Sequence, residues 1–201
     1  MCPWRCRAHI LLGVALAFPD PALAAGGIVL RRPEPGDIPW ITAACSDREL
    51  SRYIPGIPYP YAEADARAFV ERAARAWAEG SEATFVISNV PDGAGLGTIG
   101  LHLAAGDSGL AEVGYWLARE ARGRGAATIA VQLVSRWAFT VVGIDRLSLQ
   151  TAPENVASQR VAERAGFTRE GLLRAWIPAS DGRRHSVMFS LLVTDTTPEA
   201  T

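Results

Sequence analysis

A turn rich in glycine and arginine carries the clearest chemical signal in the sequence. The apolar segment 111–118 leads into Arg122-Gly123-Arg124-Gly125-Ala126-Ala127, after which the spacing of apolar residues indicates a helix. Glycines let the backbone approach an anion closely, and the first N–H groups of a helix have no partners within it. Together with the helix dipole and two arginine side chains, this turn predicts a pyrophosphate site. The same residues also fit a tight strand-to-helix turn with two solvated arginines.

A dinucleotide site of the Rossmann type is the first alternative, because Gly123-x-Gly125 opens a helix. That pattern requires a third glycine, and Thr128 occupies its position. The acid that binds the ribose should also close the next strand. Asp145 lies at about the right distance along the chain but precedes that strand. The sequence therefore gives the dinucleotide alternative little support.

Composition limits the remaining classes of protein. The chain has 201 residues, of which 49% are apolar, with 20 basic against 21 acidic side chains, and this describes one globular domain. A net charge of −1 provides no long-range field for nucleic acid, and we expect no nucleic-acid partner. Three cysteines, Cys2, Cys6 and Cys45, exclude a disulfide scaffold or a multi-cysteine zinc site. We expect no metal.

The elements that must position the turn follow from hydrophobic periodicity and turn residues. Strands are predicted at 28–32, 84–90, 97–104, 111–118, 146–151, 167–177 and 185–193. Helices are predicted at 37–45, 63–79, 125–139 and 155–165, with an irregular aromatic loop between 53 and 61. Antiparallel strands come first and a strand–helix–strand–helix–strand unit follows. This order predicts an α+β sheet with helices on both faces.

The first 26 residues have the layout of a secretory signal. Arg5 and Arg7 precede an apolar run at 10–18, and Ala22-Leu23-Ala24 resembles a cleavage site. The run is shorter than the roughly 20 residues that span a bilayer. The alternative is a translation start chosen too far upstream. We expect a leader at 1–26 that fold and activity do not need, a domain at 27–194 and a tail at 195–201.

Five segments together resemble the GNAT (Gcn5-related) N-acetyltransferases, and among them the Rim-type enzymes that acetylate ribosomal-protein N-termini. Arg122-x-x-Gly125-x-Ala127 is similar to the family's Gln/Arg-x-x-Gly-x-Gly/Ala pyrophosphate turn. Glu112-Val113-Gly114-Tyr115-Trp116-Leu117 is similar to the Rim-type strand Glu-Ile-Gly-Tyr-Trp-Leu. The other matches are 28–31 with 35–37, Pro58-Tyr59-Pro60-Tyr61, and Asn155-x-x-Ser158 with Glu163-x-x-Gly166-Phe167-x-x-Glu170-Gly171. The resemblance covers residues 28–193.

The resemblance implies a GNAT fold, a mixed and mostly antiparallel sheet with helices on both faces. A V-shaped splay would separate its fourth and fifth strands, here 111–118 and 146–151, and acetyl-CoA would lie in that V as co-substrate. Backbone groups of Trp116 and Leu117 would bond the pantetheine arm. Asn155 would lie beside this arm and also cap the following helix. The pyrophosphate would be held by the amides of Arg122, Gly123, Arg124, Gly125, Ala126 and Ala127.

The resemblance also implies an enzyme that moves an acetyl group from acetyl-CoA to a primary amine by direct attack. Ser158 would donate to the leaving thiolate, and Glu112 would accept the proton of the amine, directly or through water. The acceptor pocket would be lined by Tyr59, Tyr61 and Trp176. Each of these residues also has an ordinary structural alternative. Ser158 would lie on a polar helix face, Glu112 would be a solvated strand end, and the aromatic residues would pack in the core.

Several points stay open at this stage. His102 alternates with apolar neighbours on a predicted strand, and we expect it to be structural. Cys45 has no histidine close to it in sequence, so we expect no acyl-cysteine route. The acceptor is a protein N-terminus or a small-molecule amine such as a metabolite or an antibiotic. A CoA-binding module without turnover is the third alternative. Because acetyl-CoA is a cytosolic metabolite, we expect a cytoplasmic monomer or homodimer with no membrane partner.

Overall fold

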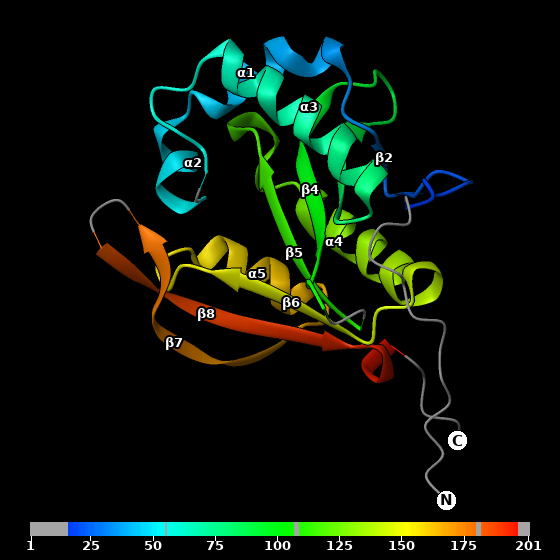
Figure 1. The fold of residues 1–201 in the computed structure, drawn as a ribbon, viewed down its shortest axis with the longest axis vertical. Helices are drawn as coiled ribbons and strands as arrows, with labels where there is room; N and C mark the ends of the chain where they lie inside the picture. The colour runs from blue at the N-terminus through cyan, green and yellow to red at the C-terminus, as the bar shows by residue number, and fades with distance from the viewer. Residues whose placement is uncertain (1–15, 55, 107–108, 180–181, 197–201) are drawn as a thin grey trace, which may run out of the picture.

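A mixed sheet, of eight strands among the residues described, forms the centre of the computed structural model (Figure 1). The structure describes residues 16–54, 56–106, 109–179 and 182–196, so most of the predicted leader and of the predicted tail lies outside it. The strand order is β1-β2-β3-β4-β5-β6-β8-β7. The strands are β1 (Ala24–Ala25), β2 (Ile28–Arg31), β3 (Glu82–Asn89), β4 (Gly95–Leu103), β5 (Leu110–Leu117), β6 (Arg146–Thr151), β7 (Thr168–Ala179) and β8 (Gly182–Leu192).

Helices cover both faces of this sheet, as predicted. They are α1 (Ile38–Cys45), α2 (Arg48–Tyr53), α3 (Glu63–Glu79), α4 (Ala126–Trp137) and α5 (Val156–Arg164). Side chains of β5 alternate between the two faces, because successive residues of a strand point in opposite directions. Val113 and Leu117 join the core cluster that contains the buried residues of α4, whereas Trp116 joins the cluster of α1 and α3. Within the described residues, none of the helices has the length and hydropathy of a membrane span.

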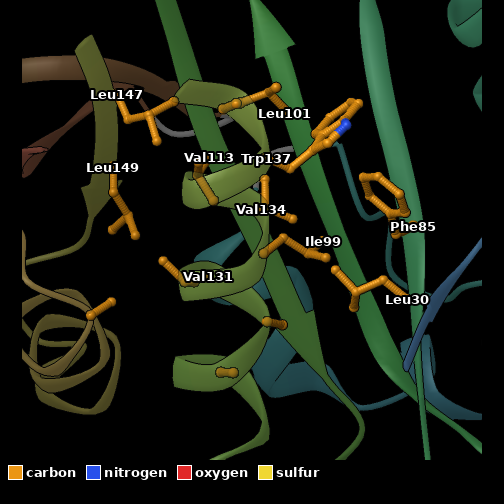
Figure 2. Close-up of a cluster of buried hydrophobic side chains, with 14 of the residues drawn as sticks. Leu30, Phe85, Ile99, Leu101, Val113, Val131, Val134, Trp137, Leu147 and Leu149 are labelled. Atoms are coloured by element: carbon orange, nitrogen blue, oxygen red, sulfur yellow. The ribbon is translucent and has the colours of Figure 1, made fainter. Parts of the chain in front are cut away.

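The larger core cluster fixes α4 against the sheet (Figure 2). Val131 and Val134 of α4 are fully buried with Leu147 and Leu149 of β6. Burying a side chain of this size stabilises a fold by roughly 1.5–3 kcal/mol. The fixed helix brings its first turn to the end of β5, where the predicted anion site lies.

The predicted V-shaped splay lies between β5 and β6. Among the described strands these two form the parallel pair, and their register runs only from Leu110↔Arg146 to Glu112↔Ser148. The pairing of β5 with β4 continues to Leu117, and that of β6 with β8 continues to Thr151. The two strands therefore diverge beyond Glu112, as Figure 1 shows. The predicted α+β sheet, with helices on both faces and a splay between these two strands, is confirmed.

Two elements differ from the sequence expectation. Helix α2 lies just before the predicted aromatic loop, where Asp47 caps it by accepting from the N–H of Glu49 at 3.0 Å. Strand β1 lies inside the predicted leader and pairs with β2. Phe18, also inside the leader, has its ring centre 5.7 Å from that of Trp77. Residues 16–26 thus contact the domain, and the boundary at residue 26 stays a prediction.

Candidate active site

The turn before α4 has the backbone that its glycines suggest. Gly123 has a φ of 76° and Gly125 a φ of 83°, both in the left-handed region that favours glycine. A Cβ atom at either position would meet nothing within 4 Å, so the space beside the backbone is open. Ala126 and Ala127 begin α4, and the first N–H groups of a helix have no partner within it. This geometry can accept an anion at the positive end of the helix.

Arg122 has a different environment from the one the motif suggests. Its guanidinium donates to Glu49 at 2.7 Å and to Asp47 at 2.9 Å, and its Nε donates to the Leu117 carbonyl at 3.2 Å. Burial acts to raise the pKa of Asp47, but the N–H of Glu49 and the Arg122 guanidinium hold it below its usual value. The side chain thus ties the turn to α2. Arg124 is exposed and is the arginine of this turn that an anion can reach.

The edge of β5 beyond Glu112 faces the opening of the V. The Trp116 side chain is buried and packs against Trp40, with ring centres 5.9 Å apart, and Leu117 is buried in the larger core cluster. These two residues can therefore offer a ligand their backbone groups rather than their side chains. An extended pantetheine arm would add to such an edge as a strand does.

On the α5 side of the V, two hydroxyl groups face each other. The Tyr115 hydroxyl lies 3.0 Å from Oγ of Ser158, and the Asn155 side chain caps α5 by accepting from the Ser158 N–H at 3.1 Å. Burial raises the pKa of Tyr115 to about 12, so the phenol keeps its proton. Sequence reasoning missed Tyr115. The alternation that places it on the face of Val113 and Leu117 was the available signal.

On the opposite face, Glu112 lies at the last paired position before the strands diverge. Its Oε2 accepts from Nε2 of Gln150 at 2.9 Å. His102 of β4 is directly opposite Glu112, and Glu82 of β3 is directly opposite His102. Nδ1 of His102 lies 3.3 Å from Oε2 of Glu82. The hydrogen bond with Glu82 is the main cause that raises the pKa of His102.

The predicted acceptor-pocket aromatics lie in different surroundings. The Tyr59 side chain is exposed, and the Arg48 guanidinium lies 5.6 Å from its ring centre. Tyr61 is partly buried against the cluster of α1 and α3, next to Cys45. Trp176 is exposed on β7, in a bulge. Ring contacts in the described part of the chain do not join Trp176 to either tyrosine.

The hairpin of β7 and β8 reaches α2. Nη1 of Arg184 donates to the Arg52 carbonyl at 2.8 Å. In the bulge that carries Trp176, the Ala175 N–H donates to Nδ1 of His185 at 2.9 Å. The hairpin and α2 therefore meet; Trp176 lies on this hairpin, whereas Tyr59 lies in the loop that follows α2.

Cys45 lies in the interior. It is 1% exposed, and burial raises its pKa to about 12, so no thiolate is available at neutral pH. The described residues contain no cluster of three or more His, Cys, Asp or Glu side chains that could hold a metal.

Comparison with known proteins gives consistent matches. Residues 28–168 match the family model of the acetyltransferase (GNAT) domain. The chain is 30% identical over 165 residues to the uncharacterized N-acetyltransferase p20 of Bacillus licheniformis, covering 82% of this chain and 92% of that protein. It is 35% identical over 101 residues to the putative ribosomal N-acetyltransferase YdaF of Bacillus subtilis, covering 50% and 55%. The structure of Mycobacterium smegmatis RimJ with CoA-disulfide has a TM-score of 0.76 at 22% identity, covering 85% and 84%.

Proposed function

Because this chain belongs to the GNAT acetyltransferase family, we propose that it acetylates the amino group of a protein N-terminus. Family membership makes it an acyl-CoA-dependent N-acetyltransferase, as the sequence predicted. The N-terminal acceptor is supported by the likeness to YdaF, which is named a putative ribosomal N-acetyltransferase. An α-amino group with a pKa near 8 is about one-tenth neutral at pH 7, so it needs less help from a base than lysine does.

The observation that carries the mechanism is the division of polar groups between the two faces of β5. The Tyr115–Ser158 pair lies on the α5 side of the V, and Glu112 lies on the α3 side. The leaving thiolate would have a proton donor on one side, and the incoming amine would have a proton acceptor on the other. This separation suits direct attack, and the buried Cys45 offers no covalent route.

The cofactor would extend from the turn into the V. Backbone N–H groups of the turn, residues 122–127, would hold the pyrophosphate, with Arg124 adding charge. The pantetheine arm would bond to the backbone of Trp116 and Leu117 and pass Asn155. The thioester would then lie where β5 leaves β6.

Acetyl transfer would proceed by direct attack between the bound substrates, without an acyl-enzyme. The amine nitrogen attacks the carbonyl carbon, the C–S bond breaks and sulfur keeps the electron pair. Glu112 accepts the proton of the amine, directly or through water, and Ser158 donates to the thiolate. Tyr59, Tyr61 and Trp176 would bound the acceptor. A cytoplasmic monomer or homodimer made of residues 27–194 is the proposed working form.

Gly125→Glu tests the cofactor site. The substituted carboxylate would occupy the open space beside the α4 N-terminus and repel a pyrophosphate, so we expect calorimetric binding of acetyl-CoA to fall at least about 100-fold. Gly143→Glu is the matched control, because Gly143 has the same φ of 83° and open surroundings but lies beyond the other end of α4. Equal affinities of the two variants for acetyl-CoA would contradict the proposal that this turn binds the pyrophosphate.

Turnover then distinguishes the acceptors. Peptides with free N-terminal alanine or serine are compared with the same peptides N-terminally blocked, with spermidine and with an aminoglycoside, by thiol release. Preference for free N-termini supports the proposal, and preference for a small amine replaces the acceptor. Binding of acetyl-CoA without turnover of any amine would indicate the CoA-binding module.

A further inference from the structure

A row of ionisable side chains crosses the α3 side of the sheet where the V begins. Glu82, His102 and Glu112 occupy directly opposed positions on β3, β4 and β5, so their side chains share one face. Gln150 of β6 extends the row through its hydrogen bond to Glu112. The row therefore connects Glu112, which is proposed to accept the proton of the amine, to His102.

The contacts of the imidazole fix its orientation. Nδ1 lies 3.3 Å from Glu82, whose other carboxylate oxygen accepts a short hydrogen bond from the Thr84 hydroxyl. A carboxylate only accepts, so Nδ1 carries the hydrogen, and Nε2 of the neutral ring keeps its lone pair. A carboxylate that holds a histidine in this way fixes its tautomer and stabilises the imidazolium.

Two glycines leave room for the ring along the sheet. A Cβ on Gly100 would lie 3.0 Å from Nε2 of His102, and a Cβ on Gly114 would lie 3.5 Å from it. Gly114 follows Glu112 on the same face of β5 and lies beyond the last residue paired with β6. Nε2 thus lies between the paired Gly100 of β4 and Gly114 of β5, displaced from Glu112 towards the end of β5 that is not paired with β6.

The charged groups around the ring favour its protonated form. Glu82 and Glu112 raise the pKa of His102, whereas burial and Arg72 of α3 act to lower it, and the net direction is upward. The side chain remains 50% exposed, so a proton taken up there can return to water. A carboxylate ordinarily titrates near 4.3 and holds a proton poorly at neutral pH, while an imidazole titrates in the working range.

We propose that His102, oriented by Glu82, receives the proton that the acceptor amine releases through Glu112. This step rests on the proposed function and extends it. As the N–C bond forms and the C–S bond breaks, one N–H proton passes by way of the Glu112 carboxylate or its water to Nε2 of His102. The sulfur keeps the electron pair of the C–S bond. The imidazolium then releases its proton to water.

The test is the dependence of kcat on pH, measured with saturating acetyl-CoA and the amine that the wild type turns over best. Glu82→Gln preserves shape and can still accept from Nδ1 but removes the charge, so the rising limb should move to lower pH by about one unit. His102→Gln should lower kcat by about 100-fold and remove that limb. Glu79→Gln is the matched control, an exposed glutamate at the end of α3 whose profile should equal that of the wild type.

Calorimetric binding of acetyl-CoA and thermal unfolding are measured for each variant alongside the profiles. If Glu82→Gln still turns over the amine and its rising limb stays at the wild-type pH, the proposed role of His102 is overturned, while the proposed function stands. If the wild type turns over no amine, the proposed function fails, and this inference fails with it. A merely structural His102 would change stability without moving the limb.

Discussion

Ser158 and Tyr115 form a hydroxyl pair that, in the proposed mechanism, would give the leaving thiolate its donor. Ser158 is held on both sides, since its N–H donates to Asn155 and its Oγ lies 3.0 Å from the Tyr115 hydroxyl. Either hydroxyl can be the donor in this pair. Because the Tyr115 phenol keeps its proton, it can donate to Oγ of Ser158. The hydrogen of the serine hydroxyl is then free to be donated to the cofactor sulfur.

Ser158→Ala should therefore lower kcat by about 100-fold while the affinity for acetyl-CoA changes little, because a donor to the thiolate acts mainly as the C–S bond breaks. Tyr115→Phe should have a smaller effect in the same direction. Ser46→Ala, at an exposed serine of the α1 end, controls for loss of a hydroxyl. Measurement of kcat and of calorimetric Kd separates the two effects. A raised KM with unchanged kcat would contradict this role.

At this scale the sequence predicted the residue types of the site better than their contacts. Gly125, Asn155 and Ser158 were predicted from local motifs. Gly125 has a left-handed φ and Asn155 accepts from the Ser158 N–H, while the roles of all three towards the substrates stay predictions. Tyr115 and Ser158 are 43 positions apart, so only the fold brings their hydroxyls together. The row of Glu82, His102 and Glu112 likewise depends on the registers of two strand pairs, which periodicity alone does not set. From the sequence alone, His102 is therefore an isolated strand histidine.

At the scale of elements, α2 is the helix that the sequence did not predict. It has only six residues, too few for periodicity to reveal a buried face, and a single buried residue, Leu50. The cap from Asp47 and the ion pairs with Arg122 hold it in place. The longer helices and strands were predicted within a few residues, because their apolar patterns cover several turns or alternations. A short helix held by distant charges has no such pattern.

Arg122→Ala tests this tether. The substitution leaves the backbone amides of the turn in place but removes three hydrogen bonds from the guanidinium, two of them to carboxylates. We expect amide hydrogen exchange in α2 to speed up by about tenfold, the effect of losing about 1.4 kcal/mol. The affinity for acetyl-CoA should fall less than in Gly125→Glu. The reverse order would mean that the Arg122 side chain binds the cofactor itself, as the motif alone suggested.

At the scale of the whole molecule, residues 16–26, which precede β2, pack against the core of the domain. Phe18 has ring centres of Trp77 and Phe85 each 5.7 Å from its own, and the Arg32 guanidinium lies 5.3 Å from its ring. The Leu16 N–H donates to the Trp77 carbonyl at 3.3 Å. These contacts join a segment with the layout of a targeting signal to the end of α3. A leader that is cleaved near residue 24 would take them away.

Two truncations separate these roles. A chain that starts at Leu16 keeps the Phe18 packing and the pairing of β1 with β2, and its urea midpoint is the reference. A chain that starts at residue 27 loses the Phe18 packing and the pairing of β1 with β2, and should be less stable by about 2–3 kcal/mol. β1 and Gly26 contact α4, but β2 also packs on this helix and stays paired with β3, so the turn should keep its place and the acetyl-CoA affinity should be retained. Equal midpoints for both chains would show that residues 16–26 add nothing to the fold, and would support the leader as a separate segment.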